Sequence, residues 1–315
     1  MTHPTPEFAL VGMAGYIAPR HLKAIKQLHG KLVLGHDLSD SVGIVDRYFP
    51  HADFTADPAV FADALSKKHI DYLTVCTPNY LHYDHSILGL AAGASVICEK
   101  PLALTCRELD RMEQAESVYG RRIHPILQLR LHPEIVRLKQ RMDGCRSDRR
   151  HEVELTYITP RGKWYNESWK GDRAKSGGVV FNIGIHFIDM LLWVFGALED
   201  VFVYTSARDS VAGVMELRKA RVKFFLSVDP AHSPQSDAGE GFVSYRHLSF
   251  DGESFDFSNG FTDLHTDSYA RILAGEGFSI ADVRPAVIAA EKIAGAKAVE
   301  AGADAHPFFS LHGRE

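Results

Sequence analysis

The chain has 315 residues, a formal net charge of −5 and a sequence pI near 6.4. This length predicts two domains. Hydrophobic residues make up 45% of the chain and charged residues 24%, proportions that exclude a long disordered tract. Without a long basic run, nucleic acid is not an expected partner. The N-terminal residues lack a signal-peptide pattern and no long apolar stretch is free of charge, so we expect a cytoplasmic protein without a membrane partner.

Residues 8 to 123 alternate short apolar strands with helices. We expect strands at 8–11, 31–37, 52–54, 72–76 and 95–98, and helices at 20–28, 61–67 and 81–92. Strands that alternate with helices form parallel sheets covered on both faces. Residues 1–123 therefore predict an α/β domain with a parallel sheet.

The second part of the chain has a different pattern. Strands follow one another at 151–159, 201–205, 210–217, 221–228 and 243–250, and helices are expected at 134–142, 182–195, 263–273 and 283–301. Residues 124–315 therefore predict an α+β domain with an open, mainly antiparallel sheet that binds substrate and mediates oligomerisation. An open sheet exposes a face that usually needs covering, which favours a dimer or tetramer.

A glycine-rich turn follows the first predicted strand. Its spacing, Gly-x-x-Gly-x-x-Ala from residue 12 to residue 18, has one residue more than the Gly-x-Gly-x-x-Gly of dinucleotide-binding turns. Asp37 lies 25 residues after Gly12 at the end of the second strand, where a carboxylate accepts hydrogen bonds from an adenosine ribose and repels a 2′-phosphate. The sequence thus predicts a Rossmann-type domain that binds NAD through Gly12, Ala14, Gly15, Tyr16, Ile17 and Asp37.

Polar residues also follow the fourth and fifth predicted strands. The carboxyl ends of parallel strands meet at one edge of the sheet, where open α/β folds bind ligands. We expect cofactor contacts there from Thr77, Pro78, Asn79, His82, Glu99 and Lys100. Pro101 favours an extended residue before it, which gives the Lys100 side chain a fixed direction.

A second polar motif precedes the most apolar helix. Asn182, His186 and Asp189 follow helical spacing and share one face, and Gly184 between them leaves the backbone open to a ligand. His186 and Asn182 are therefore candidate catalytic residues, whereas Asp189 is equally explained by a structural role. A metal-dependent enzyme that uses His186 and Asp189 lacks a visible third ligand.

The segment from 161 to 176 is rich in cations and aromatic side chains. Stacking surfaces beside several positive charges suit a sugar nucleotide with a diphosphate, so we expect substrate binding by Arg161, Tyr165, Trp169 and Lys170, together with Gln128, Arg130, His132, Asn182 and His186. The four cysteines have no metal-type spacing and the pair His82 and His85 has no third ligand in register, so we expect no metal.

These motifs resemble the Gfo/Idh/MocA oxidoreductase family. The resemblance rests on the glycine turn, Glu-Lys-Pro at 99–101 and Gly-Gly…Asn-x-Gly-x-His at 177–186, and covers nearly the whole chain. Segments 15–21, 128–133 and 168–172 are similar to the WlbA/WbpB branch. That resemblance implies NAD-dependent oxidation of the 3-hydroxyl of UDP-N-acetylglucosaminuronic acid, on the way to a diacetamido-mannuronic acid of bacterial surface polysaccharide. It also implies an aminotransferase that consumes the 3-keto product and, in some members, 2-oxoglutarate that recycles the cofactor.

The chemistry needs a base for the hydroxyl proton and a positive charge beside the developing alkoxide. An unperturbed imidazole has a pKa of about 6.5, so we assign His186 as the base, Lys100 as the stabiliser and Asn182 as the orienting residue. Many relatives carry Asp at the position of Asn182, which leaves the reverse assignment of Lys100 and His186 open. A free-sugar or inositol dehydrogenase and a non-catalytic dinucleotide-binding regulator are the alternative functions.

Overall fold

The computed structural model describes residues 5–145, 149–234, 243–255, 263–302 and 305–312. The chain divides into two compact units. The first unit contains residues 1–131 and 263–284, and the second contains residues 132–262 and 285–315. The sequence suggested one boundary near residue 123, whereas the observed division returns residues 263–284 to the first unit.

The first unit contains a parallel sheet of six strands in the order β3-β2-β1-β4-β5-β6. Its strands are β1 (Glu7–Val11), β2 (Lys31–His36), β3 (Asp53–Thr55), β4 (Tyr72–Val75), β5 (Ser95–Cys98) and β6 (Ile123–Pro125). The order reverses between β1 and β4, the position at which open α/β sheets bind ligands. The expected Rossmann-type parallel sheet is therefore confirmed.

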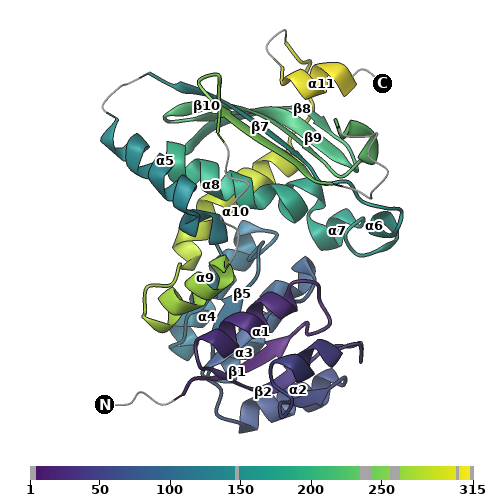
Figure 1. The fold of residues 1–315 in the computed structure, drawn as a ribbon, viewed down its shortest axis with the longest axis vertical. Coiled ribbons are helices and arrows are strands. Elements are labelled where there is room, and N and C mark those ends of the chain that lie inside the picture. Colours follow the sequence, from purple (N-terminus) through teal and green to yellow (C-terminus); the bar gives the residue numbers. More distant parts are fainter. Residues whose placement is uncertain (1–4, 146–148, 235–242, 256–262, 303–304, 313–315) are drawn as a thin grey trace. The chain divides into compact units, whose positions relative to one another are not determined.

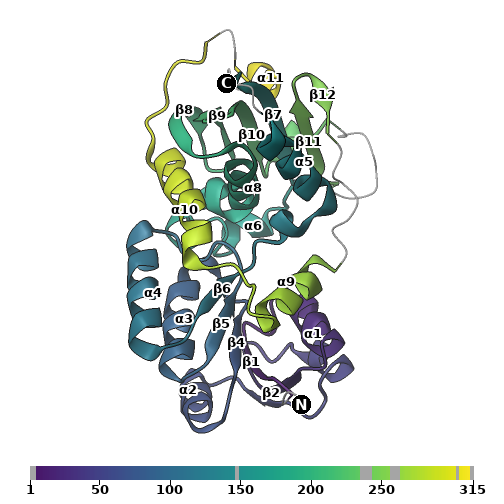
Figure 2. The ribbon, with the colours of Figure 1, turned by 90° about the vertical axis from the view of Figure 1, so that its left-hand side faces the viewer.

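Helices cover both faces of this sheet. Figure 2 shows α3 (His82–Ala91) and α4 (Cys106–Tyr119) on one side, and α1 (Ala18–Gln27) and α9 (Leu264–Leu273) on the other. Local capping explains where two helices begin: Asp57 accepts hydrogen bonds from the first turn of α2 (Pro58–Lys67), and Thr105 forms a reciprocal capping box with Glu108 at the start of α4.

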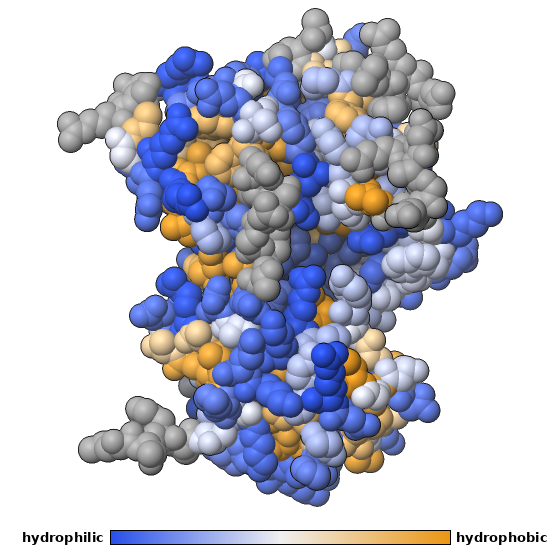
Figure 3. Space-filling view, in the orientation of Figure 1, coloured by the Kyte–Doolittle hydropathy of each residue, from blue (hydrophilic) through white to orange (hydrophobic). Residues whose placement is uncertain are grey.

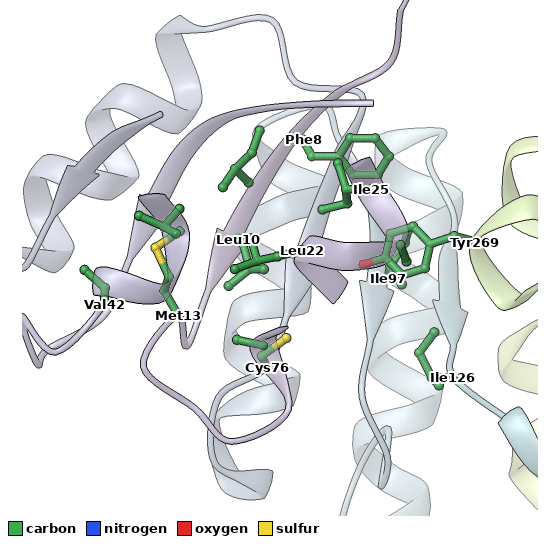
Figure 4. Packing of buried hydrophobic residues seen from close by; sticks show 14 of the residues in the cluster. Phe8, Leu10, Met13, Leu22, Ile25, Val42, Cys76, Ile97, Ile126 and Tyr269 are labelled. Carbon is green, nitrogen blue, oxygen red and sulfur yellow. The ribbon is translucent and has the colours of Figure 1, made fainter. Parts of the chain in front are cut away.

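The core on the α1 side of the sheet is completed by the segment that returns from residue 263. Tyr269 of α9 is fully buried and belongs to the same apolar cluster as Phe8, Leu22 and Ile97. Figure 4 shows Tyr269 extending from the α9 side to Ile97. The first unit therefore needs both of its chain segments to close its core.

The second unit contains a mixed sheet in the order β12-β11-β7-β10-β9-β8. Among the described residues of this unit, β7 and β10 are the one parallel pair, so the expected mainly antiparallel sheet is confirmed. The strands are β7 (His151–Ile158), β8 (Leu198–Ser206), β9 (Ser210–Leu217), β10 (Ala220–Ser227), β11 (Tyr245–Phe250) and β12 (Glu253–Ser254). Figure 1 shows α5 (Pro133–Gly144) and α8 (Ile185–Phe195) on one face of this sheet, with α11 (Pro307–His312) on the other.

Three local features differ from the expected elements. The helix expected from Asn182 begins with a π-helical turn, η4 (Val180–Gly184), before α8. The cationic segment from 161 to 176, for which no helix was expected, contains two short helices, α6 (Trp164–Glu167) and α7 (Arg173–Ser176). The helix expected at 283–301 is α10 (Ile280–Gly295), which contains Pro285. Helical periodicity predicted the helices at 182–195 and 283–301 but not their exact turns and ends, and it did not predict α6 or α7.

The helical stretch Arg173–Phe195 is long and apolar enough to cross a membrane by length and composition, yet 78% of its most apolar window is buried inside the protein. Such burial is typical of a core helix. Figure 3 shows hydrophilic residues over most of the visible surface, interrupted by scattered hydrophobic patches.

Candidate active site

The glycine turn after β1 is hydrogen-bonded to the end of β2 and lies against the backbone that follows β4. Gly12 has a φ of +86°, and a Cβ atom there would lie 2.5 Å from the carbonyl carbon of Cys76. The Gly12 amide donates to the carbonyl of His36 at 2.9 Å, and the Gly15 amide donates to the carbonyl of Gly12 at 3.1 Å. Only glycine allows this close approach, so the turn is shaped before any ligand arrives.

Asp37 contacts the same turn. One of its carboxylate oxygens accepts from the amide of Ala14 at 2.9 Å and the other from the amide of Ser39 at 2.9 Å. Tyr16 of the same turn is 88% exposed, and Leu38, which follows Asp37 in the chain, is 77% exposed. A half-buried carboxylate at this turn can accept hydrogen bonds from an adenosine ribose.

The residues predicted at the end of β4 lie close together. Thr77 Oγ1 lies 3.0 Å from His85 Nδ1, and His82 opens α3 as a buried side chain. The two ring nitrogens of His82 lie 2.7 Å from the carbonyl oxygens of Thr77 and Pro101. Burial lowers the pKa of His82 despite these carbonyl contacts. His82 therefore connects the ends of β4 and β5 rather than presenting a free imidazole.

Glu99 is directed into the interior of the first unit. Its Oε1 lies 3.0 Å from His21 Nε2 and 2.8 Å from His265 Nε2, and all three side chains are buried. Burial acts to raise the pKa of Glu99, but the hydrogen bonds from His21 and His265 hold that pKa well below its usual range. Sequence reasoning missed both histidines, because His265 lies 166 residues from Glu99 in the chain.

In the second unit, Asn182 Nδ2 donates to the hydroxyl oxygen of Tyr165 at 2.6 Å. Burial raises the pKa of Tyr165, whereas this hydrogen bond and the charge of Arg161 act in the opposite direction. Nε of Arg161 is buried, and the described residues provide no hydrogen-bond partner for it. Arg161, Tyr165 and Asn182, named here the polar cluster, are therefore brought together, and Arg161 adds a buried N–H donor that has no partner within the described part of the chain.

His186 and Asp189 lie on α8 beyond this cluster. Both residues are within the expected helix, with His186 half-buried and Asp189 buried. Gly184 is buried, and a Cβ atom at this position would lie 2.7 Å from a methyl group of Leu226 on β10. The idea that Gly184 opens the backbone to a ligand is therefore wrong, because the glycine admits a core side chain.

Some side chains of the cationic segment, residues 161–176, contact other groups of the protein. Lys170 Nζ lies 3.9 Å from the ring centroid of Trp169, a cation–π contact, and Trp164 is 54% exposed. Arg173 donates to the carbonyl of Ala294, and Gly177 ends α7 with a φ of +78°. Trp164 thus presents the exposed stacking surface, whereas Trp169 is already covered by Lys170 on one ring face.

The remaining predicted substrate residues lie near residue 130. Oε1 of Gln128 is buried, with no hydrogen-bond partner among the described residues. Arg130 donates to the carbonyl of Asp282 at 2.7 Å and lies over the ring of Phe278. His132 caps α5, where its Nδ1 accepts from the amide of Glu134 at 3.2 Å. The contacts of Arg130 and His132 are thus also structural.

Comparison with known proteins identifies the class. The family model described as "Oxidoreductase family, NAD-binding Rossmann fold" matches residues 7–126, and the model of the C-terminal alpha/beta domain of that family matches residues 151–236. The chain belongs to the Gfo/Idh/MocA oxidoreductase family, and its first unit is an NAD-binding Rossmann domain. The shaped turn at Gly12 and the carboxylate of Asp37 suit that cofactor.

Two solved structures are similar over almost the whole chain. The WlbA (WbpB) dehydrogenase from Thermus thermophilus in complex with NAD and UDP-GlcNAcA is 43% identical, with a TM-score of 0.91, over 96% of this chain and 100% of the other. A structure of that dehydrogenase with NAD and alpha-ketoglutarate is 44% identical, with a TM-score of 0.92 and the same coverage.

The curated relatives match shorter stretches. An uncharacterized oxidoreductase from Rhizobium meliloti is 25% identical over 69% of this chain and 64% of its own length. A putative UDP-kanosamine synthase oxidoreductase subunit from Amycolatopsis mediterranei is 28% identical over 61% of this chain and 58% of its own. The chain thus spans less than two thirds of the length of these two relatives.

Proposed function

We propose that this protein oxidises the 3-hydroxyl of UDP-N-acetyl-D-glucosaminuronic acid to the 3-keto sugar with NAD as cofactor. The polar cluster carries this proposal, because an unpaired arginine Nε beside a tyrosine hydroxyl suits an oxygen-rich anionic ligand. The similarity to a dehydrogenase in complex with NAD and UDP-GlcNAcA supports the substrate. The NAD-binding family of the first unit supports the cofactor.

The reaction removes a proton from the sugar hydroxyl and a hydride from the same carbon. NAD, when bound, accepts that hydride. We assign His186 as the base that takes the hydroxyl proton and Lys100 as the cation that stabilises the alkoxide. Asn182 orients Tyr165, and because the Asn182 amide donates, the tyrosine O–H is left to donate to substrate.

Only part of the expected cofactor and substrate contacts is carried into this proposal, since Glu99 and both ring nitrogens of His82 already have internal partners. We assign the nucleotide to the turn at Gly12 and to Asp37, and the uridine diphosphate to Arg161 and Lys170, with Trp164 as an exposed stacking surface. Arg130 and His132 rank lower as substrate ligands, since both already have structural partners.

The biological setting belongs to the same proposal. We place the enzyme in the cytoplasm, in bacterial lipopolysaccharide and O-antigen biosynthesis, as a homo-oligomer. A 3-keto product requires a following amination, so an aminotransferase is the expected functional partner. The structure of the 44% identical relative with alpha-ketoglutarate supports 2-oxoglutarate as the acceptor that returns bound NADH to NAD.

Product analysis tests this function. The purified protein is first analysed for co-purified nicotinamide, and is then incubated with UDP-N-acetylglucosaminuronic acid with and without 2-oxoglutarate. We expect a 3-keto sugar nucleotide and, with the oxo acid, equimolar 2-hydroxyglutarate. UDP-N-acetylglucosamine, which lacks the carboxylate, is the matched control. Turnover of myo-inositol or a free sugar instead would overturn the assignment, as would binding of NAD without any turnover.

A further inference from the structure

A buried hydrogen-bond network lies directly before Lys100 in the first unit. It runs from Thr74 on β4 through Tyr269 on α9 to His21 on α1, and then to Glu99 after β5. His265 of α9 joins it at the same oxygen of Glu99. Because side chains alternate along a strand, Glu99 lies on the same side of the sheet as Ile97, where α1 and α9 pack.

The donors and acceptors of this network form a single consistent set. With His21 neutral, the Thr74 hydroxyl donates to Tyr269 at 2.9 Å, Tyr269 donates to His21 Nδ1 at 2.8 Å, and His21 Nε2–H donates to Glu99 Oε1 at 3.0 Å. Burial lowers the pKa of His21 although Glu99 acts to raise it, which agrees with a neutral ring. Glu99 Oε2 accepts from the amide of Lys100 at 3.1 Å.

Lys100 is thus flanked by two fixed groups. On one side its own amide is bound by the carboxylate that His21 and His265 hold. On the other side the carbonyl of Pro101 lies 2.7 Å from Nδ1 of the buried His82. His21, His265 and His82 can therefore fix the backbone around Lys100 without contacting a ligand.

We propose that His21 and His265 are positioning residues, which fix the Lys100 ammonium for the reaction by holding Glu99. This inference rests on the proposed role of Lys100 in the oxidation. It assigns a function to the segment 263–284, because α9 provides both His265 and Tyr269. Misplacement of a catalytic group by about 1 Å can lower a rate about a hundredfold. A fixed position of Lys100 should therefore raise kcat.

His21, Glu99 and His265 also meet the geometric condition for a metal site, since their ligand atoms lie within 4.8 Å of one another. Hydrogen bonding already uses both oxygens of Glu99 and both nitrogens of His21. Nε2 of His21 and Nε2 of His265 both contact Oε1 of Glu99, which is the arrangement expected of two N–H donors on one acceptor oxygen. The hydrogen-bonded network therefore accounts for these residues without an ion.

The test compares variants that remove or keep the side-chain donor to Glu99 at position 265. His265→Leu removes it, and His265→Gln replaces it with an amide N–H of similar reach. We expect His265→Leu to lower kcat by about 10- to 100-fold with little change in the Kd for NAD, and His265→Gln to recover most of kcat. In a Lys100→Met background, His265→Leu should lower kcat no further.

His124→Leu is the matched control. His124 Nδ1 lies 3.2 Å from the carbonyl of Phe278, so this histidine also binds the segment 263–284, but it has no described hydrogen bond to Glu99. We expect a loss of thermal stability comparable with that of His265→Leu and an unchanged kcat. Equal losses of kcat in the two variants, or additive losses of His265→Leu and Lys100→Met, would show a general structural role and overturn the proposal.

A substrate-independent measurement separates this inference from the proposed function. The rate at which an amine-reactive acetylating reagent modifies Lys100 is followed by mass spectrometry in the NAD-free protein. We expect a several-fold faster modification in His265→Leu and the parent rate in His124→Leu. Parent-like labelling in His265→Leu overturns the positioning role, even if UDP-N-acetylglucosaminuronic acid is not a substrate. Full kcat in Lys100→Met would instead refute the catalytic role of Lys100.

Discussion

The nucleotide-binding edge of the first unit and the polar cluster of the second unit are built in different ways. The edge is shaped by backbone: Gly12 and Gly15 are hydrogen-bonded within the turn, and Asp37 holds the turn through an amide. The polar cluster consists of side chains, among which the Asn182 amide donates to the Tyr165 hydroxyl oxygen. A backbone site suits a cofactor that does not vary, whereas a side-chain site allows substrate specificity to change by substitution.

The largest effects should come from the two candidate catalytic residues, one in each unit. If His186 takes the proton, His186→Asn should lower kcat by roughly two to four orders of magnitude at neutral pH. This loss should shrink as pH rises, because hydroxide removes the proton without the imidazole. Lys100→Met should show a deficit that persists until the parent lysine deprotonates.

The pH dependence of kcat in each variant is the measurement, and cofactor affinity is the control, because we expect NAD binding to survive in both variants. A titrating limb near neutrality that remains in His186→Asn but vanishes in Lys100→Met would reverse the two roles. Lys100 would then be the base.

The backbone character of the nucleotide edge is tested by Gly12→Ala. The new Cβ would lie 2.5 Å from the Cys76 backbone at a φ of +86°, so we expect a loss of more than about 2 kcal/mol of stability and a large rise in the Kd for NAD. Gly93→Ala is the matched control, since Gly93 has a φ of +83° and nothing within 4 Å of a Cβ atom.

The control should lose only about 1 kcal/mol and should leave NAD binding intact. Chemical denaturation and cofactor titration measure the two quantities. Equal losses in Gly12→Ala and Gly93→Ala would mean that the left-handed backbone, rather than the close approach to β4, makes glycine necessary.

The side-chain character of the polar cluster is tested by Arg161→Gln. We expect the KM for the UDP-sugar acid to rise about tenfold with NAD affinity little altered, because charge-assisted hydrogen bonds to phosphate are lost. Lys170→Gln should have a smaller effect, since this lysine already lies over the ring of Trp169. Lys175→Gln, which removes an exposed cation paired with Asp172, is the control. An unchanged KM in Arg161→Gln would move the diphosphate site towards Arg130 and His132.

The two regions also differ in how far the sequence predicted them. The parallel sheet, the glycine turn and Asp37 were predicted because apolar strands and turn glycines are local signals. The partnership of Glu99 with His21 and His265 was not predicted, because it depends on how α9 returns to the first unit. The packing of Leu226 on β10 against Gly184 was not predicted either, because these two residues become neighbours only in the folded protein.

Asp37→Ala tests a smaller effect at the nucleotide edge. It should weaken NAD binding about tenfold and relax the exclusion of NADP, because the ribose acceptor and the charge that faces a 2′-phosphate are removed together. Asp37→Asn separates these effects, since its amide oxygen still accepts from the Ala14 amide without the charge. Titration of both cofactors is the measurement. An unchanged preference for NAD over NADP in both variants would leave Asp37 as a turn residue only.

The last expected effect concerns two histidines, His85, which is half-buried in the first unit, and His306, which is buried in the second. Burial lowers the pKa of His85 to about 4 in the first unit, with smaller contributions from His82 and His36. In the second unit, burial lowers the pKa of His306 to about 4, with contributions from Lys223 and His247. Thr156 Oγ1 lies 3.1 Å from Nε2 of His306, and the amide of Phe308 donates to its Nδ1.

An unfolded histidine binds its proton near pH 6.5, so between about pH 6.5 and 4 the unfolded state holds more protons than the folded state. The stability that these neutral rings contribute is therefore complete above pH 6.5 and decreases as pH falls towards 4. His306→Gln should make this decrease shallower by up to about 1.4 kcal/mol per pH unit, since glutamine does not titrate.

Tryptophan fluorescence can assign this effect to one unit. Trp164, Trp169 and Trp193 all belong to the second unit, so their emission during urea unfolding reports on that unit. We expect His306→Gln to change the pH dependence of the fluorescence midpoint, and His85→Gln to change only the transition of the first unit, followed by amide exchange. A fluorescence midpoint that responds to pH equally in the parent and in His306→Gln would show that other groups of the second unit carry the proton linkage. If His85→Gln shifts the fluorescence midpoint as much as His306→Gln does, the two units unfold together, and the contrast between them is confined to their binding sites.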